Sequence, residues 1–187
     1  MNEPKNINEI ILNSEPIFAG DYLTIDRVMV ELPDGRRAYR DVVRHPGAVA
    51  VLALNDQGDI LLERQYRTAL DEVILEIPAG KIDPGEDRGL AAARELEEET
   101  GFRSNQLNFL GDVILAAGYS DEKISIYLAT ELIPGRAKLD EDEFLEWHFV
   151  PRNEVLDLIR HNQIQDSKTI AALMFLKLQG ETLDQAR

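Results

Sequence analysis

GKIDPGEDRGLAAARELEEETGF, residues 80–102, is the most informative stretch of this 187-residue sequence. Its last acidic residues have helical spacing. On an α-helix Glu95, Glu98 and Glu99 share one face, because positions three and four apart are neighbours. Like charges this close repel one another unless they are protonated or bridged by a cation, and oxygen ligands suit Mg²⁺ or Mn²⁺. The stretch therefore predicts a metal site.

The limits of this helix are also legible. Asp83-Pro84-Gly85 is a turn signal, Asp87 is a favourable N-cap, and Gly101 stands where a glycine commonly ends a helix. The side of the helix away from the carboxylates is apolar and is expected to face a core, through Ala92, Ala93 and Leu96.

Composition limits the possible partners. The chain has 35 acidic and 20 basic residues, a formal net charge of -15, and no cysteine. Such a surface repels phosphate backbones, so nucleic acid and anionic membranes are poor partners. The lack of cysteine excludes thiol catalysis and cysteine-type zinc sites. Neither a signal-peptide pattern nor an apolar run of about 18 residues is present, which makes a cytoplasmic location the expectation.

Apolar runs predict strands interleaved with helices. Residues 17–44 are expected to form a small antiparallel sheet with a hairpin turn at Pro33-Asp34-Gly35, while residues 1–13 are polar and are expected to be partly loose at their start. Residues 47–54 and 59–67 predict paired central strands. Further strands are expected at 73–77, 107–115, 124–128 and 146–150, and helices at 153–159 and 166–178. This order favours an α/β or α+β fold, divided into residues 1–45 and residues 46–187.

Acidic helices are more often merely solvated surface, and that interpretation has to be weighed here. The full spacing argues against it. The pattern G-x5-E-x7-R-E-U-x-E-E-x-G-U, where U is apolar, is matched without departure at Gly80, Glu86, Arg94, Glu95, Leu96, Glu98, Glu99, Gly101 and Phe102. The stretch resembles the Nudix box, the signature of hydrolases that cleave a nucleoside diphosphate linked to another moiety.

Beyond the box the chain resembles the ADP-ribose pyrophosphatase branch of that family. The likeness extends over the N-terminal strands and the segments ERQYR, EIPAGKID and GYSDEKISIYLA. It implies a Nudix fold, in which a mixed β-sheet is sandwiched between helices and a small N-terminal antiparallel sheet is added. In that branch the small sheet is exchanged between two subunits, so the resemblance implies a homodimer.

The resemblance also assigns roles to residues. It places Mg²⁺, with Mn²⁺ as a substitute, on Glu95, Glu98 and Glu99 and on the backbone carbonyl of Ala79. Glu98 thereby counts among the catalytic residues. We expect Arg94 to pair with Glu86 or a neighbouring carboxylate and to hold the loop against the helix.

The general base is expected on the acidic segment 140–143. In related enzymes a glutamate of this loop activates the water, and Glu141 matches it best, with Glu143 second. Arg40 and Arg67 are candidates for binding the phosphates and the nucleobase side, although both could be ordinary surface arginines. Glu122 could bind water or metal, or serve only in a turn.

The implied reaction is Mg²⁺-dependent hydrolysis of the pyrophosphate of a small-molecule nucleoside diphosphate sugar. ADP-ribose, giving AMP and ribose 5-phosphate, is expected first and GDP-mannose second. Ala117 stands where the branch usually has proline, and Tyr119 lies near a tyrosine common in diadenosine polyphosphate hydrolases. A hydrolase of dinucleoside polyphosphates or nucleoside triphosphates is therefore one alternative. A non-catalytic ADP-ribose sensor is an alternative from another class.

Overall fold

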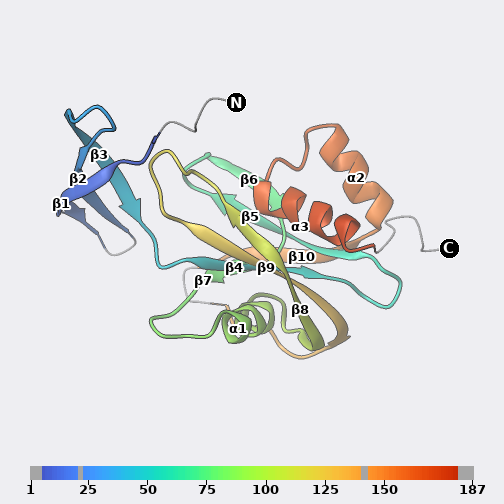
Figure 1. Ribbon diagram of the computed structural model, residues 1–187. Helices are drawn as coiled ribbons and strands as arrows, with labels where there is room; N and C mark the ends of the chain where they lie inside the picture. The colour runs from blue at the N-terminus through green and yellow to red at the C-terminus, as the bar shows by residue number, and fades with distance from the viewer. Residues whose placement is uncertain (1–5, 21–22, 140–142, 181–187) are drawn as a thin grey trace. The chain divides into compact units, whose positions relative to one another are not determined.

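The computed structural model describes residues 6–20, 23–139 and 143–180 (Figure 1). The chain forms two compact units, one made of Met1–His45 with Ile114–Lys123 and the other of Pro46–Val113 with Ile124–Arg187. Segment 114–123 thus makes its contacts with the N-terminal region, where the Val43 amide donates to the Tyr119 carbonyl at 2.7 Å. The predicted division of the chain into an N-terminal region, residues 1–45, and a main domain, residues 46–187, stays a prediction.

The first unit contains an antiparallel sheet of strands β1 (Ile10–Ala19), β2 (Thr24–Glu31) and β3 (Arg37–Arg44), in that order. The expected sheet and hairpin turn are confirmed. The first strand begins at Ile10 and not at the expected Ile17. The expectation of a partly loose start falls largely on residues 1–5, which lie outside the described residues. Residues 10–16 lack a strand-like apolar alternation, but they pair with β2 and include a register shift between Ile11 and Asn13. Backbone pairing with a neighbour supplies the order that the side chains do not indicate.

The second unit contains two sheets. Strands β7 (Ala79–Lys81), β4 (Ala48–Ala53), β9 (Lys123–Ile133) and β8 (Arg103–Ile114) form a mixed sheet in that order. In it β4 pairs antiparallel with β7 and parallel with β9. Strands β10 (Leu145–Val150), β5 (Ile60–Arg67) and β6 (Glu72–Glu76) form an antiparallel sheet. The helices are α1 (Arg88–Thr100), α2 (Arg152–Arg160) and α3 (Ser167–Leu178).

The expected pairing of residues 47–54 with residues 59–67 is wrong. The two segments share only an isolated bridge between Leu54 and Ile60, next to the turn at 55–58. Beyond it β4 pairs with β7 and β9, whereas β5 pairs with β6 and β10. Strand pairing depends on partners distant in sequence, which the local pattern does not reveal.

Helices cover both faces of β4, as the α/β prediction requires. Val49, Val51 and Ala53 are fully buried in the cluster that contains Ala92 and Leu96 of α1. The alternate side chains of β4 belong to a second cluster with residues of α2 and α3. Figure 1 shows α1 on one side of the strands and α2 and α3 on the other. None of the helices in the described residues is long and apolar enough to cross a membrane.

Candidate active site

Helix α1 begins and ends where the sequence predicts. The Asp87 carboxylate accepts hydrogen bonds from the amides of Gly89 and Leu90 at 2.9 and 3.2 Å, and Gly101 has φ of 79°. The buried face differs in one respect, because Ala93 is exposed and Ala91 is buried instead. The reason is that the carboxylate face itself turns inward. The side chains of Glu95 and Glu99 therefore point into the protein, whereas that of Glu98 is 44% exposed.

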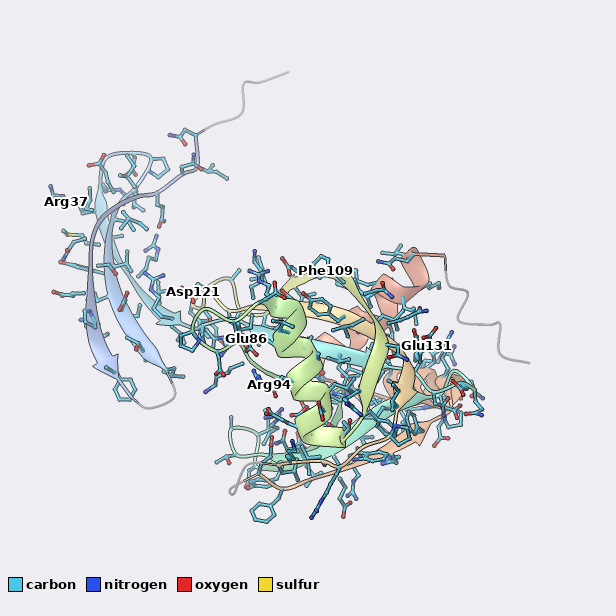
Figure 2. All side chains as sticks on the ribbon, turned by 90° about the horizontal axis from the view of Figure 1, so that it is seen from below. Arg37, Glu86, Arg94, Phe109, Asp121 and Glu131 are labelled. Atoms are coloured by element: carbon cyan, nitrogen blue, oxygen red, sulfur yellow. The ribbon has the colours of Figure 1, made fainter. Side chains whose placement is uncertain are left out.

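Arg94 connects the loop before α1 to the helix. Its Nε and Nη2 each donate to one Glu86 oxygen at 2.9 Å, and Nη2 also donates to the Lys81 carbonyl at 3.0 Å. Nη1 donates to Glu95 at 2.8 Å and to Glu98 at 2.9 Å. All five N–H donors of the guanidinium are thereby used. Figure 2 shows Arg94 on α1 and Glu86 in the preceding loop. The predicted structural role of Arg94 is confirmed.

This pairing fixes the charge state of Glu86. Hydrogen bonds from Arg94, followed by the bond from the Asp83 amide, lower the pKa of Glu86 to about 2. At neutral pH Glu86 is therefore ionised, and its ion pair with Arg94 holds the loop between β7 and α1 against the helix.

Glu95 and Glu99 lie against strand β7. Glu99 is 3% exposed, and its Oε2 accepts from the Ala79 amide at 3.0 Å. Burial, followed by repulsion from Glu63, Glu95 and Glu143, raises the pKa of Glu99 well above its ordinary value. The pKa of Glu95 is also raised, mainly by burial, although Arg94 opposes this shift.

Glu63 of β5 joins this group of carboxylates. Burial raises the pKa of Glu63 to about 8, with further contributions from repulsion by Glu76 and Glu143. Its Oε1 is buried and has no hydrogen-bond partner among the described residues. Carboxylates from β5, α1 and the segment before β10 thus repel one another electrostatically. We call Glu63, Glu95, Glu99 and Glu143 the carboxylate cluster.

The carboxylate cluster suits a hard divalent cation. A cation would offset the mutual repulsion and provide a partner for buried oxygen atoms. Within residues 6–20, 23–139 and 143–180, however, no three acidic or histidine side chains already stand in a metal-binding arrangement. The Glu95 and Glu98 carboxylates accept hydrogen bonds from Arg94, and the Glu99 carboxylate accepts one from the Ala79 amide. The metal assignment to Glu95, Glu98, Glu99 and the Ala79 carbonyl stays a prediction.

Of the two candidate bases, Glu141 lies outside the described residues. Glu143 is described, and its Oε1 accepts from Gln65 Nε2 at 3.2 Å. On the other side of the acidic segment, the Lys138 amide donates to the Glu98 carbonyl at 2.7 Å. Lys138 is thus attached to α1 and Glu143 to β5, and the assignment of the base to Glu141 or Glu143 stays a prediction.

Next to Glu143 there is a cavity of about 490 Å³, lined also by Tyr66, Val73 and Phe144. This volume falls within the range of pockets that hold small ligands, about 300–1,000 Å³. The cavity offers aromatic surface beside an acidic group.

Arg67 lies in the same unit as the box. Its Nε donates to Glu76 Oε1 at 2.7 Å, and the other Glu76 oxygen accepts from Lys168 of α3. Glu76 and Lys168 are 1% and 7% exposed. A structural role of Arg67 as a partner of Glu76 is thus established, and a role in substrate binding stays a prediction.

Arg40 and Glu122 belong to the first unit. Arg40 pairs with Glu9 and donates to the Tyr39 carbonyl at 3.0 Å. Glu122 Oε1 lies 3.8 Å from His45 Nε2. Contacts of Arg40 and Glu122 with substrate stay predictions.

Sequence reasoning missed Glu63, Gln65 and Glu76 as part of this site. The available signal was an acidic residue inside an otherwise apolar strand, at Glu63 in ILLERQYR. That signal is weak, because the surroundings of Glu63 depend on its pairing with β6 and β10, which the local sequence does not place.

Comparisons with known proteins agree with this geometry. The NUDIX domain model matches residues 43–173. An ADP-ribose pyrophosphatase of Bacillus subtilis is 40% identical over 93% of this chain and 95% of its own length. A methanol dehydrogenase activator of Bacillus methanolicus is 42% identical over 94% and 96%. A crystal structure of an ADP compounds hydrolase superposes with a TM-score of 0.81 and 31% identity, covering 96% of this chain and all of that one. The chain belongs to the Nudix hydrolase family.

Proposed function

We propose that this protein hydrolyses the pyrophosphate bond of nucleoside diphosphate sugars with Mg²⁺, and that ADP-ribose is its first substrate. Water and ADP-ribose would give AMP and ribose 5-phosphate. The observation that carries the proposal is the carboxylate cluster, built beside an intact box whose Arg94 holds loop and helix together. The likeness to an ADP-ribose pyrophosphatase over nearly the whole chain supports the choice of substrate.

The residues of the site divide the chemistry between them. A divalent cation held by Glu95, Glu98, Glu99 and the Ala79 carbonyl would neutralise pyrophosphate charge and make bound water more acidic. We assign the general base, which accepts a proton from the attacking water, first to Glu141 and second to Glu143, whose Oε1 accepts from Gln65. The water oxygen bonds to phosphorus while the bond from phosphorus to the bridging oxygen breaks. Arg40, Arg67 and Glu122 are proposed to bind the substrate.

Four other functions are alternatives. The first is hydrolysis of GDP-mannose, the second candidate substrate. GDP-mannose pyrophosphatases are among the relatives, and that of Cronobacter sakazakii is 28% identical to this chain. Tyr119 is 62% exposed and is compatible with a polyphosphate substrate. An ADP-ribose sensor would bind without cleaving. The likeness to a methanol dehydrogenase activator adds a further candidate, activation of a dehydrogenase.

The test is a substrate panel with Mg²⁺, containing ADP-ribose, GDP-mannose, diadenosine polyphosphates and nucleoside triphosphates, with products identified by chromatography. We expect AMP and ribose 5-phosphate from ADP-ribose, and a loss of at least about 100-fold in turnover in Glu98→Gln. Cleavage of polyphosphates alone would overturn the substrate assignment. ADP-ribose binding without cleavage would favour the sensor.

A homodimer is part of the proposal. Strand β1 is exposed along its length and presents the apolar side chains of Ile11, Ile17 and Phe18. Apolar side chains on an edge strand favour pairing with another chain. Analytical ultracentrifugation is expected to give the mass of a dimer. A cytoplasmic location stays a prediction.

A further inference from the structure

Glu63 occupies the centre of the antiparallel sheet of the second unit. It lies on the middle strand β5, opposite Glu76 of β6 and Trp147 of β10. Residues directly opposite one another on neighbouring strands point to the same face, as do residues two apart on one strand. Glu63 therefore shares a face with Gln65, the residue that holds Glu143. At 1% exposure it is almost fully removed from solvent.

Lys168 and Arg67 both hydrogen-bond to Glu76, the residue opposite Glu63. Their charges favour the ionised form of Glu63 but are outweighed, since burial and repulsion by Glu76 and Glu143 still raise its pKa. Within the described part of the chain, Oε1 of Glu63 is buried without a hydrogen-bond partner. A buried carboxylate oxygen without a partner is costly and is rarely retained without a reason.

The neighbours of Glu63 indicate that reason. Repulsion acts between Glu63 and Glu99, the box residue that is attached to Ala79. Repulsion from Glu143 also acts on Glu63. Carboxylates from three separate segments thus approach one another, and one of them has a buried oxygen with no partner. A divalent cation would satisfy that oxygen and offset the repulsion.

We propose that Glu63 is a further carboxylate of the divalent-cation centre, contributed by strand β5 from outside the Nudix box. The inference rests on the proposed function in taking the cation to be the one that serves hydrolysis. It does not depend on which substrate is cleaved. The competing account is a buried acid that stays protonated and serves only packing.

The experiment is a titration of the metal-free, full-length protein with Mn²⁺, followed by electron paramagnetic resonance in the absence of substrate. Glu63→Gln is the decisive variant, because it keeps the shape and removes the charge. We expect its Mn²⁺ dissociation constant to rise about 10-fold or more. Glu146→Gln is the matched control. Glu146 lies in the same sheet with a side chain that is 77% exposed, and its removal is expected to leave the affinity unchanged.

A protonated packing acid predicts the opposite result. In that case Glu63→Gln would bind Mn²⁺ as tightly as the parent protein, which would overturn the inference. If circular dichroism shows that Glu63→Gln does not fold, Glu63→Met takes its place, since it removes both the charge and the buried polar atoms. The same loss of affinity is expected, and parent-like affinity again overturns the proposal.

Separate measurement of hydrolysis keeps the two proposals distinguishable. If ADP-ribose is cleaved while Glu63→Gln keeps the parent affinity for Mn²⁺, this inference fails and the function stands. If no substrate of the panel is cleaved while Glu63→Gln binds Mn²⁺ more weakly, the inference stands and the function fails.

Discussion

Gly80 determines where the Glu95 carboxylate can lie. A β-carbon at Gly80 would stand 2.1 Å from Cδ of Glu95 and 2.2 Å from each of its oxygens. Such distances are far below van der Waals contact. A side chain at position 80 would therefore force the end of the Glu95 side chain out of its place against the backbone.

Gly80→Ala is expected to displace Glu95 from the carboxylate cluster and from Arg94. Mn²⁺ affinity and turnover should both fall by about 10-fold or more, the usual effect of misplacing a group at a metal site. Spin-resonance titration and the hydrolysis assay measure the two effects. Gly118→Ala is the control for metal affinity, because its added β-carbon meets nothing within 4 Å among the described residues. Unchanged Mn²⁺ affinity in Gly80→Ala would contradict the role given to Gly80.

Among the secondary-structure elements, local sequence signals were sufficient to predict the ends of α1. They were insufficient to predict which strands pair in the sheets. Asp87 and Gly101 determine the helix ends through bonds within a few residues, and the sequence predicted both. Strands β4 and β5 belong to different sheets because β4 pairs with β9, which is distant along the chain. The same limit applied to the site, since the box was evident from spacing but Glu63 is buried by elements that the sequence did not position.

Helix α3 is joined to β6 by buried polar contacts. Lys168 binds Glu76, and the Thr169 hydroxyl accepts from the Ile77 amide at 3.0 Å. Asp166 is the N-cap of α3 and accepts from the Thr169 amide at 2.9 Å. The end of β6 is thereby fixed just before the strand that enters the box.

Lys168→Ala should lower the free energy of unfolding by about 3 kcal/mol, because it leaves the buried Glu76 with Arg67 as its remaining cation. Urea denaturation measures the loss. The control is Lys177→Ala, an exposed lysine in the last turn of the same helix, with an expected change within about 0.5 kcal/mol. Equal losses in the two variants would mean that the pair with Glu76 contributes no more than a surface lysine.

For the whole molecule, the buried carboxylates link stability to pH. The pKa of Glu63 is raised to about 8, and those of Glu95 and Glu99 are raised as well. An unfolded glutamate titrates near its ordinary value, so at higher pH the folded state holds the extra protons. The free energy of unfolding of the metal-free protein is therefore highest at pH values below the ordinary pKa of glutamate. It falls as the pH rises through the raised pKa values of the folded state. A cation that binds the charged carboxylates opposes this loss.

The metal-free protein is thus expected to melt at a lower temperature near about pH 9 than near about pH 6. Added Mg²⁺ should raise the melting temperature more at the higher pH. Differential scanning calorimetry with and without a chelator measures both effects. In Glu63→Gln the decline with pH should be smaller, since one of the responsible groups is absent. A cation effect that is the same at both pH values would contradict the link.

The end of the box also rests on residues much later in the chain. A β-carbon at Gly101 would lie 2.6 Å from the Ala137 nitrogen, and one at Gly135 would lie 2.5 Å from the Gly101 oxygen. These two glycines touch after the chain has passed through β8 and β9. The 23-residue signature is therefore not portable by itself. Transplanting it into another scaffold requires the later segment that contains Gly135 as well, because a side chain at either glycine would collide with the backbone of the other segment.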